Sequence, residues 1–242
     1  MKTSIALVLI AACGGGGGGS TDGGGSADAG SKVFMDAPPP INATMLKVSG
    51  TASASDNNGN TPLAGVVVAF YKSSDETTAL AMQTTDATGA YSFMIPTGGT
   101  AVDGFVEASI SGYATNYLYP EAALTADFAA DVSLINSTNF GLLGAVTGQS
   151  TAKGFITAVI LDASDAVVVG ATVTSSPAAT YKYTASGGIP SGTSGTTADG
   201  VGYFINAPVG AITISATKTG TTFQSVTLKA HPNSLTTTTI TP

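Results

Sequence analysis

The chain has 242 residues, of which 43% are hydrophobic and only 10% are charged. Acidic residues outnumber basic ones by 15 to 8, all the basic ones are lysine, and the formal net charge is −7. A chain with no arginine and no lysine cluster lacks the usual means of binding nucleic acid or anionic lipid, so neither partner is expected. The single cysteine excludes an intrachain disulfide and a cysteine zinc cluster.

Residues 1–12 have the pattern of a signal peptide. Lys2 is followed by an eight-residue apolar run, Ile5 to Ala12, which is too short to span a bilayer. The run ends in Ile10-Ala11-Ala12-Cys13, which resembles the bacterial lipobox. The resemblance implies export, cleavage before Cys13 and a lipid anchor on that cysteine. Two or more acyl chains would hold the chain stably on its membrane.

Two points about this end of the chain stay open. An ordinary secretory signal with a chance cysteine is the alternative, and a signal of twelve residues is short enough to question whether Met1 is the true start. In the lipoprotein resemblance, Gly14 rather than aspartate after the cysteine favours the outer membrane.

Residues 13–43 are predicted to be a flexible linker. They begin with a run of Gly, Ser, Asp and Ala that offers little surface to bury, and Pro38 to Pro40 then stiffen the chain. The linker would lift a folded body off the lipid surface.

Two similar segments follow, over 44–134 and 153–242. Both alternate apolar and polar residues, as in Ile212 to Thr217, and both place Gly at turns, which is typical of antiparallel β-sandwiches. Four pairs of residues correspond between the two segments: Gly65 and Gly170, Gly89 and Gly200, Phe93 and Phe204, Gly112 and Gly220. In the hairpin closed by Asp86 to Gly89, we expect Tyr91 and Phe93 to face the core and Ser92 to face outward.

The first segment resembles the carboxypeptidase regulatory-like domain, a transthyretin-like (prealbumin-like) sandwich of seven strands. The match is carried by Gly50, Pro62 to Val66, Thr85-Asp86, Gly89, Tyr91, Phe93, Pro96 and Gly112-Tyr113. The second segment departs from the pattern: Gly202 stands where an aromatic residue is expected, and a Ser/Gly-rich loop over 186–195 interrupts it. The fold class is therefore all-β, with two tandem transthyretin-like or Ig-like sandwiches after a disordered tether.

Residues 135–152 are expected to connect the two sandwiches through a short helix over 137–146. Ser137 or Thr138 would cap it, and Leu142, Leu143 and Val146 would share its apolar face.

Catalytic residue types are scarce. His231 is the only histidine, which is too few for the hydrolases and intradiol dioxygenases known on transthyretin-like folds, and we interpret it as a solvent-facing residue. Asp56 to Asn60 lacks the glycine and glutamate of a calcium loop and fits a hairpin turn better. Asp162, Asp165 and Asp199 could share a cation only if the fold brings them together.

Tyr113, Tyr117 and Tyr119 could stack on sugar rings, but without tryptophan we expect them to pack at a sheet edge or between the sandwiches.

These observations predict a non-catalytic, lipid-anchored protein of the cell envelope that needs no cofactor and no metal. Its role would be structural, through contact with an unknown envelope protein. The first alternative is a glycan- or peptide-binding module, and a hydrolase or other enzyme on this fold is the second.

Overall fold

The computed structural model describes residues 41–56, 59–185 and 188–242. The expected signal peptide, the lipidation residue Cys13 and nearly all of the linker lie outside these ranges. Within them the regular secondary structure is β-strand apart from one short helix, which confirms the predicted all-β fold class. No helix in the described part of the chain is long and apolar enough to cross a membrane.

The first half of the molecule, residues 41–134, is a sandwich of two layers. One layer, the first-half sheet, contains five strands: β1 Met45–Asp56, β2 Gly59–Pro62, β5 Ala90–Pro96, β8 Phe128–Ala129 and β9 Val132–Leu134. The other layer contains β3 Val67–Lys72, β4 Ala81–Thr84, β6 Gly104–Ser109 and β7 Asn116–Leu118.

The second half, residues 153–242, is also a two-layer sandwich. One layer contains β10 Gly154–Ile160, β12 Thr180–Thr184, β13 Pro190–Gly192, β14 Val201–Ala207 and β18 Leu235–Ile240. The other layer, the second-half sheet, contains β11 Thr172–Ser176, β15 Gly210–Lys218, β16 Thr221–Thr222 and β17 Val226–Ala230. The Ser/Gly-rich loop thus contains an edge strand, β13.

The two halves repeat one topology. β1 pairs antiparallel with β5 and parallel with β9, and β10 pairs in the same two ways with β14 and β18. The paired strands β3 and β6 correspond to β11 and β15. Three of the four predicted correspondences are glycines with positive φ at both positions: Gly65 and Gly170, Gly89 and Gly200, and Gly112 and Gly220. Because only glycine adopts this conformation readily, these positions mark equivalent turns.

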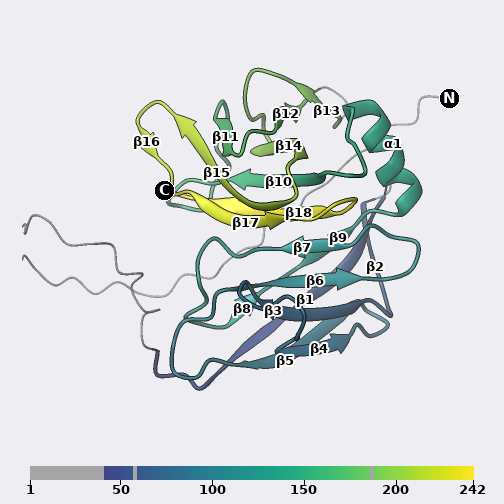
Figure 1. The fold of residues 1–242 in the computed structure, drawn as a ribbon, viewed down its shortest axis with the longest axis vertical. Coiled ribbons are helices and arrows are strands. Elements are labelled where there is room, and N and C mark those ends of the chain that lie inside the picture. Colours follow the sequence, from purple (N-terminus) through teal and green to yellow (C-terminus); the bar gives the residue numbers. More distant parts are fainter. Residues whose placement is uncertain (1–40, 57–58, 186–187) are drawn as a thin grey trace, which may run out of the picture.

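The halves are joined through a continuous sheet. β18 of the second half pairs in parallel with β7 of the first, so that nine strands form one central sheet in the order β13-β12-β14-β10-β18-β7-β6-β3-β4. In Figure 1 the purple-to-teal first half and the green-to-yellow second half meet along β7 and β18. Tyr119 N–H also donates to the Thr237 carbonyl, at 2.9 Å. No pattern in the sequence indicates this pairing.

One row of neighbouring residues crosses this junction on a single face of the central sheet. Register partners on adjacent strands face the same side of a sheet. The row consists of Met82, Ala69, Glu107, Tyr117, Thr236, Ile156, Phe204 and Tyr181. The second-half sheet covers the end of this face that belongs to the second half.

The first hairpin has the predicted register. Tyr91 is buried, Ser92 is exposed, and the Tyr91 hydroxyl donates to the Ala130 carbonyl. Phe93 faces the core, as predicted, although it is only partly buried. The Asp86 carboxylate accepts hydrogen bonds from Thr88 and from the Ala90 N–H, and these bonds lower its pKa.

The connector forms α1, Ser137–Thr147, where a helix was expected, although two details differ. The cap is Asn136, whose Oδ1 accepts from the Asn139 N–H at 2.8 Å, and not Ser137 or Thr138. The buried face consists of Phe140 and Leu143, while Leu142 and Val146 are exposed. Phe140 packs α1 against the central sheet, because its ring contacts Phe155 of β10 edge-on, with 6.0 Å between the ring centroids.

Candidate functional site

The most distinctive group of side chains lies where the two halves meet. We call Tyr71, Phe105, Tyr117, Tyr119 and His231 the aromatic joint. Phe105 is at its centre and is 1% exposed, with ring centroids 5.7 Å from Tyr71, 5.9 Å from Tyr117, 4.9 Å from Tyr119 and 6.2 Å from His231. Phe105 and Tyr119 belong to one hydrophobic cluster with Ile156 and Phe204 of the second half.

His231 is not the solvent-facing residue that the sequence suggested. Its ring stacks on Tyr117 with centroids 3.8 Å apart and an interplanar angle of 9°. Its Nε2 atom is buried and has no hydrogen-bond partner among the residues that the structure describes. Burial lowers the pKa of His231, and the charge of Lys229 lowers it further while Glu76 opposes the shift. Strand β17 ends at Ala230, and the next residue, His231, lies against Tyr117 of the first half.

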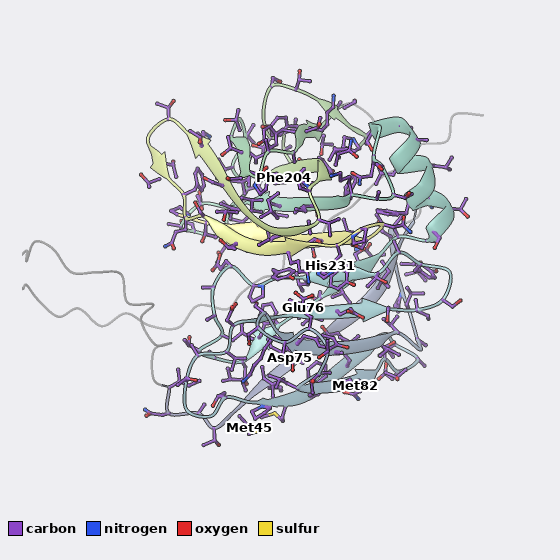
Figure 2. The ribbon with its side chains drawn as sticks, viewed as in Figure 1. Met45, Asp75, Glu76, Met82, Phe204 and His231 are labelled. Atoms are coloured by element: carbon purple, nitrogen blue, oxygen red, sulfur yellow. The ribbon has the colours of Figure 1, made fainter. Side chains whose placement is uncertain are left out.

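An ion pair also crosses the junction. Lys229 Nζ lies 2.5 Å from Glu76 Oε2, with side-chain exposures of 43% and 25%. In Figure 2, His231 and Glu76 lie where the two halves face each other. At these exposures the pair is worth at most about 1 kcal/mol, so it orients the halves more than it stabilises them.

Glu107 adds a second carboxyl group beside the joint. Burial raises its pKa, and the nearby charge of Glu76 raises it further. Burial and the charge of Glu107 in turn raise the pKa of Tyr117 to about 12, so this phenol stays protonated. A protonated tyrosine and a stacked neutral histidine suit packing better than general acid or base catalysis.

The structure does not bring a catalytic set around His231. Ser234 is the nearest serine in sequence, and its hydroxyl donates to the His231 backbone carbonyl at 2.9 Å. In the described part of the chain, no group of three or more His, Cys, Asp or Glu side chains could hold a metal ion. The aspartates singled out in the sequence are used locally: Asp162 accepts from Ser164 and Ala166, and Asp199 from Thr184, Thr197 and Val201.

The other sequence candidates have structural roles. Tyr117 and Tyr119 pack between the halves and Tyr113 packs against the first-half core, which confirms the packing interpretation over an exposed sugar platform. Asp56 and Gly59 are register partners of the antiparallel pair β1 and β2, as a hairpin turn requires. Asn57 and Asn58 lie outside the described residues, as does Cys13.

A cavity of about 400 Å³ lies beside the joint, between the halves. The segment 118–129 forms one wall, and Leu161, Asp165, Thr239 and Thr241 form the other. Val102 and Leu124 exchange two backbone hydrogen bonds, which hold the first wall in place. A hydrogen bond of 2.9 Å from Thr241 Oγ1 to Glu121 Oε2 links the two walls. Sequence analysis missed this cavity because its walls come from segments that are distant in the chain, such as Glu121 and Thr241, which are 120 residues apart.

Comparisons with known proteins add little. No family model matches the chain, and no curated protein matches it. Among solved structures, the shaft pilin SpaA from Lactobacillus rhamnosus GG is 16% identical with a TM-score of 0.26, over 82% of this chain and 98% of the pilin. The minor pilin GBS52 of Streptococcus agalactiae is 10% identical with a TM-score of 0.28, over 81% and 94%.

A third solved structure, 3-chlorocatechol 1,2-dioxygenase from Rhodococcus opacus 1CP, is 12% identical with a TM-score of 0.29, over 40% of this chain and 63% of the enzyme. Likeness at these TM-scores and identities assigns neither a common fold nor a shared function.

Proposed function

We propose that this chain is a non-catalytic, lipid-anchored protein of the bacterial cell envelope, with a structural or protein-interaction role. The observation that carries the proposal is the pairing of β7 with β18, which makes two sandwiches one continuous body. Two tandem domains on a simple linker move independently by default, whereas a shared sheet and a shared core fix their relative orientation. Such a body suits a spacer or scaffold better than a flexible array does.

The anchor is the second element of the proposal. Cleavage before Cys13 and acylation of its thiol would attach the body to a membrane, with residues 14–44 between the lipid and the first strand. The absence of aspartate after the cysteine points to the outer membrane. The partner would be another envelope protein, contacted through the body that the tether presents.

The two halves, in this proposal, are divergent copies of one carboxypeptidase regulatory-like module. Their common strand pairing and the three equivalent positive-φ glycines support this origin. An enzymatic role is disfavoured because His231 is held in a stack and its neighbours do not form a nucleophile-base pair.

Fractionation of cells tests the anchor. The wild-type chain should stay in the membrane pellet in high salt, and globomycin should cause a larger precursor to accumulate. Cys13→Ser should move the protein to the soluble exported fraction, while the tether variant Ser20→Ala should behave as wild type. If Cys13→Ser still pellets in high salt, the anchor proposal is wrong.

Spin labels test the rigid body. Labels at the exposed residues Asp103 and Thr219, introduced as cysteines in a Cys13→Ser background, report the distance between the halves. A single narrow distance distribution is expected. A broad distribution, similar to that of two domains on a free linker, would contradict the structural role.

A further inference from the structure

The cavity between the halves has the dimensions and position of a small-molecule site. Its volume of about 400 Å³ lies within the range of about 300–1,000 Å³ that is usual for ligand pockets, which occur preferentially between domains. It is built largely from the segment that follows β7. Binding there would require neither the lipid anchor nor a particular membrane.

The charges around the cavity all have one sign. Glu121, Asp127 and Asp165 line it, and no lysine does. Glu121 uses Oε2 to accept from Thr241, and Asp127 uses Oδ1 to accept from the Lys47 N–H at 2.8 Å. Among the residues that the structure describes, the other oxygen of each carboxylate makes no hydrogen bond. The cavity therefore offers acceptors to a cation.

Apolar side chains form the rest of the wall. Leu118 and Leu124 contribute from the first half, Phe128 extends from β8, and Leu161 closes the far side from the second half. Leu161 is 3% exposed and Leu124 is 8% exposed, so both are fixed parts of the wall. A ligand that fits must combine positive charge with aliphatic surface.

The spacing of the carboxylates decides between a metal ion and an organic cation. These three side chains do not form a group that could hold one metal ion, since no such group occurs in the described part of the chain. A ligand whose positive charges are spread along a chain can reach more than one of them. Methylene segments between the charges would lie on the leucine and phenylalanine side chains.

We propose that this cavity binds a linear aliphatic polyamine. The ammonium groups would pair with Glu121, Asp127 and Asp165, and the methylenes would displace water from the apolar wall. The turn that presents Asp165 is tight, with a φ of 60° at this residue and a hydrogen bond of 3.0 Å from its N–H to the Asp162 carbonyl. The carboxylates are thus carried by ordered backbone on both walls.

Titration of spermidine into the purified full chain at low ionic strength, followed by calorimetry, tests the proposal. Saturable binding at one site is expected. The triple variant Glu121→Gln, Asp127→Asn, Asp165→Asn should weaken binding about tenfold, since exposed ion pairs contribute about 0.2–1 kcal/mol each. A matched variant, Asp75→Asn, Asp86→Asn, Asp103→Asn, removes the same charge elsewhere and should change the affinity less than twofold.

A wall variant and two other solutes test whether the binding depends on both the charge and the chain of the polyamine. Ala126→Lys places a competing ammonium on an exposed wall residue without removing an acid, and it should also weaken binding. Mg²⁺ at equal charge concentration should compete poorly, and hexane-1,6-diol should not bind. The proposal is overturned if spermidine does not saturate, if Mg²⁺ displaces it equally well, or if the two triple variants bind alike.

Discussion

Replacing Phe105 with alanine should destabilise both halves of the molecule. The ring is 1% exposed, packs against four other rings, and belongs to a hydrophobic cluster that includes side chains of the second half. Full burial of a phenylalanine predicts a loss of about 3–5 kcal/mol on truncation to alanine. Against total stabilities of about 5–15 kcal/mol, such a loss is large. With a urea dependence near 3 kcal/mol per molar, the midpoint should fall by about 1–2 M.

Phe93→Ala is the matched control. Phe93 is only partly buried and stacks on one ring, Tyr91, at 5.9 Å, so its truncation should cost about 1–2 kcal/mol. Urea unfolding of the chain from residue 41 onward, followed by circular dichroism, gives both values.

Hydrogen exchange then shows which strands lose stability. In Phe105→Ala the amides of β14, in the second half, should lose protection together with those of β5, because the halves share a core. The reasoning is refuted if Phe93→Ala is the more damaging change, or if β14 keeps its full protection in Phe105→Ala.

Three other outcomes are expected. Gly89→Ala should destabilise the chain far more than Gly98→Ala in thermal melts: both glycines have positive φ, but a Cβ at Gly89 would lie 2.4 Å from the Ala52 carbonyl oxygen and one at Gly98 would contact nothing within 4 Å. The pKa of His231 is lowered in the folded state, so the free energy of unfolding should fall as the pH drops below about 6.5, where the unfolded chain takes up the proton. His231→Phe should remove this part of the pH dependence. A variant with the same pH profile as the wild type would contradict the prediction. Residues 44–134 alone should fold into β-structure, since they contain β1 to β9, but should self-associate through the uncovered β7 edge, which size-exclusion chromatography would reveal.

The sequence was sufficient for the local structure. Period-two alternation predicted strands such as β15, in which Ile212, Ile214 and Ala216 are buried. The glycines located turns because positive φ is a local property of the backbone, and the register of the first hairpin followed from its turn. The helix was found by its position, although propensity could not show that Asn136 would cap it or that Phe140 would be buried.

The junction between the halves could not be read from the sequence. β18 is the strand Leu-Thr-Thr-Thr-Thr-Ile, which has the composition of an exposed strand, yet Thr236 is 0% exposed and Thr238 is 4% exposed. β18 lies inside the central sheet between β10 and β7, and β7 is more than 110 residues away in the chain. Pairing at this distance is decided by the packing of whole layers and not by local pattern. The clustered tyrosines indicated packing between the sandwiches as one possibility, but neither the pairing of β7 with β18 nor the cavity had a sequence signal.

Gly202 stands in β14 where the corresponding strand of the first half, β5, carries Tyr91. In the first half, Tyr91 of β5 fills the core, and β4 pairs with β3. In the second half β12 pairs instead with β14, on the other layer, and places Tyr183 directly opposite Gly202. Tyr183 is 4% exposed, and its hydroxyl accepts from the Val173 N–H at 2.8 Å. A side chain at position 202 would collide with Val173, since a Cβ there would lie 2.6 Å from its Cγ1. The glycine is therefore required by the close approach of Val173, and the aromatic ring that β5 carries in the first half is carried in the second half by β12.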